Sequence, residues 1–274
     1  MLREFKIVSI LPGCLLVFSG LFTVSLCGQN KDVLATGDQA VYGADGSVQV
    51  PLTDEAQFGV MLHTQGVGLT ARRGFYQNAF RIKWWGVDLL TYKNPKEERT
   101  SNPVYEDGRP YVYGKVNTLQ MLRLWRGGQK LRSEKLRKDA VRFSTQWRCG
   151  VSLGVLKPVY MEIGYQSDGS HDVPYDYIAT ERYDPDEHFS NYIYGQAAWM
   201  NGLDELRVVP GFHGSYGLDF EYGGVRHVQR TLAVGLAVDA FLESPEIFAE
   251  KFEQNNRFFV TLFATFEIGG NWTR

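Results

Sequence analysis

Four side chains that can act as acid, base or nucleophile recur near the C-terminal end of the chain: His213, Ser215, Asp219 and Glu221. Alternate residues of a β-strand point to the same face, so a strand at this position would bring all four together. A serine becomes a nucleophile when a histidine and a carboxylate activate it. The chemistry suggested by these four residues is therefore hydrolysis.

The pair His213 and Ser215 resembles the His-x-Ser pair of outer-membrane lipid A deacylases, and the resemblance is confined to these residues and Gly214. In that family the pair works at the lipid-facing surface, where its substrate lies. Here the alternation of the surrounding residues places the pair on the opposite face, together with the charged side chains. We therefore expect no catalytic residue, and keep a lipid-modifying hydrolase that uses His213 and Ser215 as an alternative.

A second group of polar side chains offers oxygen atoms of the kind that bind calcium. The group consists of Asp172, Asp176, Asp184, Asp186, Glu187 and His188. Its spacing lacks the Asp-x-Asp-x-Asp-Gly pattern of a calcium loop. We expect a solvated acidic loop here, and we expect neither a metal ion nor a cofactor elsewhere in the chain.

The element that would position the charged residues is clearest between Val141 and Val155. One alternate series is mainly apolar and comprises Val141, Phe143, Thr145, Trp147, Cys149, Val151, Leu153 and Val155. The other series is polar or small and comprises Arg142, Ser144, Gln146, Arg148, Gly150, Ser152 and Gly154. A tilted strand that crosses a bilayer needs only ~9–11 residues. This stretch is typical of a transmembrane strand with its apolar face in lipid and its polar face in a lumen.

Seven further segments carry similar patterns, which makes eight strands, an even number as in bacterial barrels. The predicted strands are 58–63, 67–72, 79–92, 111–125, 141–155, 207–221, 231–240 and 258–272. The fold class expected is all-β: a transmembrane, antiparallel, up-and-down β-barrel. The count becomes ten if Leu156 to Tyr165 pairs as a strand of its own, and a soluble β-sandwich is the structural alternative.

The connections between these strands differ in length and charge. The longest, 156–205, is predicted to be extracellular, and His188 to Leu206 within it could form a short amphipathic helix. Another long polar loop covers 93–110, and a basic connection runs from Arg126 to Lys138. An even number of strands places both termini in the periplasm. The basic connection is then a solvated turn or a contact with acidic lipid head groups.

The polar faces of the predicted strands carry many charges. The residues expected in the lumen are Arg72, Arg81, Lys83, Lys115, Arg142, Arg148, His213, Asp219, Glu221, Asp239 and Glu267. Buried charges must be paired because removing one from water costs several kcal/mol. We therefore predict a plugged lumen with an internal network of ion pairs, in which Arg142 and Arg148 reach Glu221 or Asp219. A path for protons or solutes is the functional alternative.

The N-terminus has the features of a secretory signal. Arg3 and Lys6 precede an apolar run from Ile7 to Leu26, and small residues follow at Cys27 and Gly28. Cleavage after Gly28 is expected. An uncleaved anchor is one alternative, and acylation of Cys27 is another, although the preceding leucine is bulky where lipoproteins have a small residue.

The expected organisation is therefore a signal peptide at 1–28, a flexible periplasmic segment at 29–54 and the barrel at 55–274. After cleavage Cys149 is the one remaining cysteine, which leaves no internal disulfide and no cysteine-based zinc site. The formal net charge of -2 gives no reason to expect nucleic-acid binding. Beyond residue 28 we find no apolar run of helix-spanning length, which excludes a helical membrane bundle.

The C-terminal half shows a family resemblance. The runs PGFHGSYGLDFEYG, LAVGLAVDAF and NNRFFVTLFATFEIGGNW, together with GVSLGVLKPVYMEI, are similar to small outer-membrane β-barrel proteins of the Bacteroidota. Some members of that group accompany type IX secretion or other envelope assemblies. The last strand of such proteins often carries a signal for barrel insertion, which Phe266, Gly269 and Trp272 match in type.

Together these observations lead to one expectation about function. The chain is expected to be a non-enzymatic outer-membrane barrel that acts as an accessory or scaffold subunit of an envelope secretion or assembly complex. Its expected partners are outer-membrane lipid, lipopolysaccharide and other envelope proteins. A small-solute channel or transporter remains a further alternative.

Overall fold

The structure, a computed structural model, describes residues 41–42, 48–49, 54–78, 80–103, 105, 107–133, 141–167, 175–225, 228–252 and 254–272. The chain divides into two compact units, Met1–Gln49 and Val50–Arg274. In the first unit, β1 (Val41–Tyr42) pairs with β2 (Val48–Gln49). The expected signal peptide lies outside the described residues, as does most of the segment expected to be flexible.

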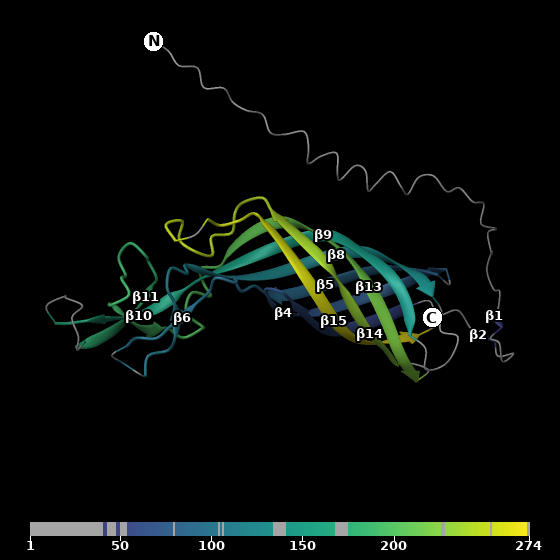
Figure 1. Cartoon of the computed structure of the whole chain (residues 1–274), viewed down its shortest axis with the longest axis horizontal. Helices are drawn as coiled ribbons and strands as arrows, with labels where there is room; N and C mark the ends of the chain where they lie inside the picture. The colour runs from purple at the N-terminus through teal and green to yellow at the C-terminus, as the bar shows by residue number, and fades with distance from the viewer. Residues whose placement is uncertain are drawn as a thin grey trace, which may run out of the picture. The chain divides into compact units, whose positions relative to one another are not determined.

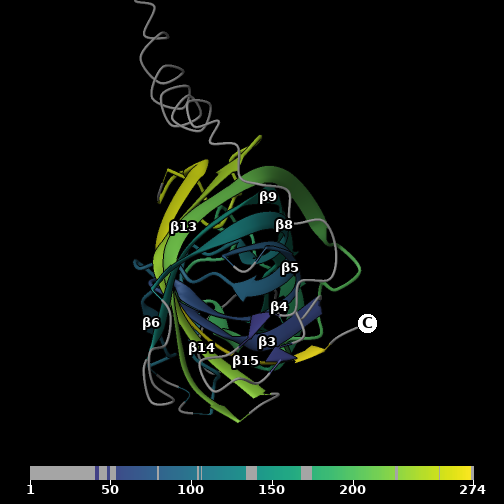
Figure 2. The same ribbon diagram turned by 90° about the vertical axis from the view of Figure 1, so that its right-hand side faces the viewer.

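The second unit contains a closed antiparallel barrel of eight strands (Figures 1 and 2). Its strands are β3 (Asp54–His63), β4 (Gly66–Asn78), β5 (Arg81–Thr91), β8 (Asn117–Ser133), β9 (Arg142–Pro158), β13 (Arg207–Val225), β14 (Val228–Phe241) and β15 (Phe258–Trp272). Each strand pairs with the next in this order, and β15 closes the barrel against β3. The prediction of an all-β, eight-stranded, up-and-down barrel is confirmed.

Alternate side chains of the strands point to the two faces of the barrel wall as expected. In β9, Cys149 and Val151 are exposed on the outer face, while Arg148 and Ser152 are buried inside. Large apolar side chains cover the outer face, among them Phe58, Leu62, Leu89, Trp147, Phe212, Leu236, Leu262 and Ile268. The result is an apolar outer wall around a largely polar interior, which is the arrangement of a transmembrane barrel.

The predicted facing of β5 was wrong. Ile82 and Trp84 point into the barrel, so Arg81 and Lys83 lie on the outer face. The reason is that an aromatic and an aliphatic side chain occupy lumen positions at this level. An assignment that put Arg81 and Lys83 inside therefore reversed the strand.

The expected basic connection after the fourth strand is also largely a strand. β8 continues to Ser133, and its outward positions include Arg126 and Lys130. Gly127 and Gly128 carry no side chain that could mark a face, so the alternation disappears from the sequence here. Residues 134–140, the rest of the expected connection, lie outside the described residues.

The connections after β3, β5, β9 and β14 lie at one end of the barrel, which we call the head end. The opposite end, where β3 begins and β15 ends, is the terminus end. Two small sheets form in the head connections (Figure 1). They consist of β6 (Arg99–Thr100) with β7 (Tyr111–Val112), and of β11 (Tyr177–Arg182), β10 (Tyr160–Tyr165) and β12 (Ile193–Gln196).

This arrangement decides two expectations about the longest connection. β10 pairs with β11 and β12 rather than with the barrel, so the strand count of the barrel is eight and not ten. The segment from His188 to Leu206 contains turns and β12 instead of the expected helix. In the described part of the chain there is no helix long and apolar enough to cross a membrane.

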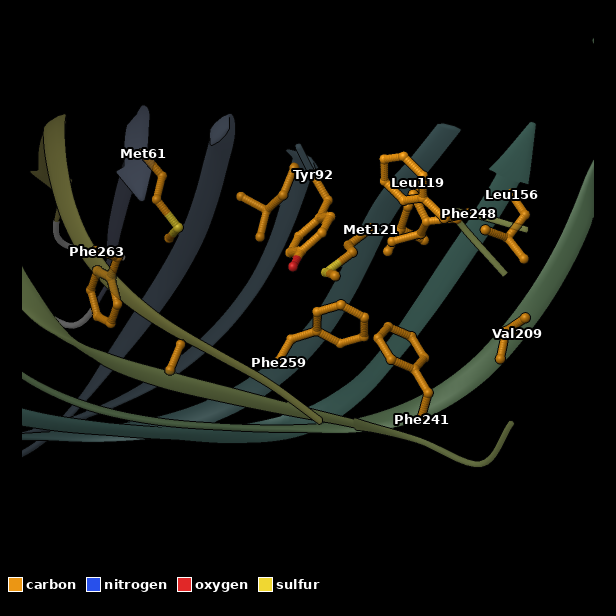
Figure 3. Packing of buried hydrophobic residues seen from close by; sticks show 13 residues of the cluster. Met61, Tyr92, Leu119, Met121, Leu156, Val209, Phe241, Phe248, Phe259 and Phe263 are labelled. Carbon is orange, nitrogen blue, oxygen red and sulfur yellow. The ribbon is translucent and has the colours of Figure 1, made fainter. Parts of the chain in front are cut away.

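The lumen at the head end is filled by apolar side chains, a feature that we call the apolar plug (Figure 3). Its members are Met61, Leu90, Tyr92, Leu119, Met121, Leu156, Val209, Ala237, Phe241, Ile247, Phe248, Phe259 and Phe263. Edge-to-face contacts join the rings of Phe259 to Tyr92 at 4.8 Å and to Phe241 at 5.5 Å. The sequence interpretation expected charge pairing inside the barrel and did not foresee this layer.

Candidate functional site: the packed lumen

Below the apolar plug, toward the terminus end, the lumen is crossed by a network of ions. Arg72 of β4 contacts Glu267 of β15, and its guanidinium lies 3.6 Å from the carboxylate of Asp219 on β13. Arg148 of β9 lies 3.9 Å from the other oxygen of Glu267. All four side chains are almost completely buried. Two cations and two anions from four strands thus balance each other's charge inside the barrel.

Neutral amides complete this network. The Nε and Nη2 groups of Arg72 donate to Oε1 of Gln57 at 3.0 and 2.6 Å. Gln146 accepts from Arg72 at 3.2 Å and from Arg148 at 3.0 Å, and donates to Asp219 at 2.5 Å. Arg72, Arg148 and Asp219 therefore each have both a counter-charge and hydrogen bonds, the conditions under which burial of charge is tolerated. Glu267 is balanced by its ion pairs with the two arginines.

Aromatic rings enclose the two arginines. The guanidinium carbon of Arg72 lies 4.3 Å from the ring centroid of Trp84, and that of Arg148 lies 4.4 Å from the ring of Trp125. Such contacts are stronger when desolvated. The inward tryptophans, which sequence reasoning had not assigned to the lumen, thus hold the cations in place.

A second group of polar residues surrounds Asp239 of β14. Arg123 donates to both of its oxygens, with Nε at 3.0 Å from Oδ1. The hydroxyl of Ser152 donates to Oδ1 at 2.5 Å, and Nδ1 of His213 lies 3.1 Å from the same oxygen. Asp239 and Ser152 have no exposed surface, and His213 is 5% exposed.

This geometry differs from that of a serine nucleophile. Such a nucleophile requires a serine hydroxyl hydrogen-bonded to the histidine, with the acid on the far side of the ring. Here the serine beside the acid is Ser152, and it bonds to Asp239 rather than to His213. Ser215 lies between Arg148 and Ala237 in the sheet register, on the inner face of the wall. The arrangement stabilises a buried carboxylate.

The structure places some of the predicted lumen charges together and others elsewhere. Those inside the network are Arg72, Arg148, Asp219, Asp239 and Glu267. Arg142 pairs with Glu221 at 3.5 Å near the terminus end, as predicted, but both side chains remain partly exposed. The carboxylate that Arg148 contacts is Glu267, and not Asp219 or Glu221 as expected.

The expected lumen position of Lys115 was wrong. It precedes β8 in a head connection, where its ammonium lies 2.6 Å from a carboxylate oxygen of Glu97. It is also bridged through its backbone to Phe248. The residue lies outside the barrel because β8 begins only at Asn117, whereas the predicted strand began at Tyr111.

Several lumen residues were missed by the sequence interpretation: Glu55, Gln57, Asp88 and Arg123. Arg123 was detectable, because it is an alternate residue in the same series as Leu119, Met121 and Trp125 and therefore lies on the same face of the strand. It was missed because the alternation of its segment is imperfect around Thr118 to Gln120, which left the faces of the predicted strand unassigned.

The proposed insertion signal lies at the end of β15. Phe266 is outward and 42% exposed. Gly269 pairs with Gln57 and Gln229, and the backbone of Trp272 pairs with Asp54. These positions suit a segment that closes the barrel, and its role in insertion stays a prediction.

The acidic loop uses its charges within the protein. Asp186 pairs with Lys251 at 2.7 Å, and Oδ1 of Asp184 accepts the backbone N–H of Asp186. His188 lies 3.3 Å from Glu181 and also contacts the backbone N–H of Asp184. Within the described residues no group of side chains is arranged to hold a metal ion, and Asp172 lies outside them.

The head contains a small tyrosine-rich core of its own. Its buried members are Tyr111, Val159, Met161, Ile163, Tyr183 and Ile193. The hydroxyl oxygen of Tyr183 accepts the backbone N–H of Gly114 at 3.1 Å, and burial raises the pKa of this phenol to about 12. The backbone N–H of the same residue donates to Val159, so the head is tied to the chain that leaves β9.

Comparison with known proteins gives little further information. No protein-family model matches the chain, and no curated protein matches it. Among solved structures, the chain is similar to the crystal structure of Neisserial surface protein A, with a TM-score of 0.37 and 7% sequence identity. The match covers 80% of this chain and 96% of that protein. The assignment of the fold therefore depends on the strand pairing and facing described above.

Proposed function

We propose that the chain is an integral outer-membrane barrel with a permanently closed lumen, which acts as an accessory or scaffold subunit of an envelope secretion or assembly complex. The proposal places both termini of the chain in the periplasm and the head outside the cell. The apolar outer wall supports the membrane location. The two filled layers of the lumen support a role that depends on outer surfaces and not on transport.

The observation that carries the scaffold role is the edge of the head sheet. In the order β11-β10-β12, strand β11 has a neighbour on one side only. Its residues Tyr177 and Ile178 are 53% and 46% exposed. An open strand edge with exposed apolar side chains can accept a strand of a partner, because main-chain groups supply the bonds and side chains supply the selectivity.

The chemistry of the partner follows from this edge. It is a protein with an extended segment whose apolar side chains can cover Ile178. The resemblance noted in the C-terminal half makes components of type IX secretion the first to be examined. Outer-membrane lipid and lipopolysaccharide are the expected partners of the barrel wall.

The experiment is an affinity purification of the tagged protein from outer membranes in mild detergent, followed by mass spectrometry. We expect one set of envelope proteins in fixed stoichiometry with the wild type. Ile178→Lys should lose it, because a lysine on an edge strand opposes strand pairing. Met200→Lys, which changes another exposed apolar head residue outside β11, should retain it. Recovery of the wild type as a clean monomer would reject the scaffold role.

A further inference from the structure

The outer wall of the barrel contains an apolar groove of about 890 Å³. It extends over β3, β4, β5, β8 and β9 and reaches Ile268 of β15. Its outward-facing apolar lining is Ala56, Phe58, Ala71, Trp85, Val87, Leu124, Cys149, Val151 and Ile268. Small side chains such as Ala56 and Ala71 lie beside bulky Phe58 and Trp85, and this difference in height creates the hollow.

Two arginines face outward into this groove. Arg73 of β4 and Arg126 of β8 are the cross-strand partners of Trp85 on either side of β5. The guanidinium carbon of Arg126 lies 5.7 Å from the centroid of a Trp85 ring. Arg73 contacts Asp54 at 2.9 Å, yet its side chain remains 51% exposed. One tryptophan thus separates two cations on an otherwise apolar wall.

The outward charges near the groove are mainly positive. Four further outward cations lie on β5 and β8, toward the terminus end: Arg81, Lys83, Lys130 and Arg132. Within the described parts of β3, β4, β5, β8 and β9, the one carboxylate at an outward-facing position of the alternation is that of Asp54, and this residue is only 3% exposed. The groove therefore combines an apolar channel with a rim of net positive charge, in which Asp54 pairs with Arg73.

We propose that this groove binds an anionic phospholipid, with the phosphate between Arg73 and Arg126 and an acyl chain along the apolar lining. The inference depends on the proposed location of the barrel in a membrane. A guanidinium on a lipid-facing wall is costly unless it reaches a head group or another partner. A lipid phosphate accepts hydrogen bonds from guanidinium groups in pairs, and the hollow accepts the chain.

The position of the groove favours a phospholipid over lipopolysaccharide. Arg73 and Trp85 lie near the terminus end of β4 and β5, and the additional cations lie closer still to that end. In the proposed orientation this end faces the periplasmic leaflet. Bound lipid A is the alternative occupant that the experiment separates.

The test uses Trp85 as its reporter in vesicles of phosphatidylcholine that contain a small fraction of phosphatidylglycerol. The acyl chains of one lipid or the other are brominated, which quenches nearby tryptophan. The quenching of Trp85 is obtained as the difference in quenched tryptophan fluorescence between the wild type and Trp85→Phe. Two cations near a membrane surface should favour the anionic lipid at least about tenfold.

Two variants serve as the matched pair. Arg73→Gln/Arg126→Gln should reduce quenching by the brominated anionic lipid to the level given by brominated phosphatidylcholine. Lys130→Gln/Arg132→Gln removes the same charge from β8 residues that do not line the groove, and should keep the selectivity. Flotation of the vesicles and the heat-dependent shift in gel mobility show separately whether each variant is inserted and folded.

Three results would overturn the inference while leaving the barrel in the membrane. Equal quenching by the two lipids in the inserted wild type is the first, and selectivity that persists in Arg73→Gln/Arg126→Gln is the second. The third is displacement of the brominated phospholipid by equimolar lipid A but not by unlabelled phosphatidylglycerol. Failure of the wild type to insert at all would instead reject the proposed membrane location.

Discussion

Arg123 binds Asp239 at two points across the lumen, although its nearest acidic neighbour in the sheet is Asp88. Three strand pairings separate β8 from β14 around the barrel, through β9 and β13. The pair therefore joins two sides of the wall through its interior. An inward arginine on one strand thus contributes to the closure of the lumen.

Removal of one partner from this pair should destabilise the barrel strongly. Asp239→Leu leaves the Arg123 charge buried, and we expect a loss of about 3–5 kcal/mol in the free energy of unfolding. Adding Arg123→Met should recover part of that loss. Denaturant unfolding in detergent, followed by tryptophan fluorescence, measures both changes.

The matched control for this prediction is Arg142→Gln. Arg142 and Glu221 are 3.5 Å apart but partly exposed, so the expected loss is below about 1 kcal/mol. A loss as large as that of Asp239→Leu would show that burial does not determine the strength of these pairs.

The facing of the strands can be tested by placing one charge on the wall. Leu236 of β14 is outward, 45% exposed and far from both ends of its strand. Leu236→Arg should therefore cost about 2–4 kcal/mol in a bilayer. Lys83→Leu on the outer face of β5 should be almost neutral. If Lys83→Leu were strongly destabilising, the residue would be paired inside the lumen after all.

The hydrolase alternative makes a separate prediction about Ser215. Because His213 is bound to Asp239 and not to Ser215, Ser215→Ala should leave the lipid A of the outer membrane unchanged. Mass spectrometry of extracted lipid A from wild-type and variant strains provides the measurement. If lipid A from the Ser215→Ala strain carried a different number of acyl chains from wild-type lipid A, the enzymatic interpretation would be restored.

The head should loosen in alkali before the barrel does. Burial raises the pKa of Tyr183 from 10.0 to about 12. The folded head therefore holds this proton more tightly than the unfolded head. Its contribution to stability is complete below pH 10 and is lost as the pH rises through 12.

Tyrosinate absorbance and limited proteolysis of the head between pH 9 and pH 12.5 should follow this loss. Tyr183→Phe removes the titrating hydroxyl and should flatten the pH dependence, at the cost of the hydrogen bond from Gly114. An unchanged profile in Tyr183→Phe would assign the alkaline transition to other groups.

The barrel itself could be predicted because a strand reverses its facing at every residue. From Val141 to Val155 this alternation is nearly unbroken, and the structure reproduces it residue by residue. The pattern fails where both faces are apolar. Phe258 is 70% exposed and Phe259 is 6% exposed, and their chemistry does not distinguish them.

The contents of the lumen were less predictable for the same reason. Cation pairing could be expected from the charge of inward positions such as Arg72 and Glu267. The apolar plug could not, because Met61 and Phe241 look like lipid-facing residues in a sequence. The partners of each ion also depend on strands that meet only across the lumen, as with Arg123 and Asp239.

The central claim is that the lumen is closed and that the protein acts through its outer surfaces. Conductance across planar bilayers tests it most directly, with a general porin as the positive control in the same membranes. We predict no steady current from inserted wild-type protein between pH 5 and pH 8, because the apolar plug and the ion network both cross the lumen. A steady, ion-selective current from the folded wild type would contradict the claim and identify the protein as a channel.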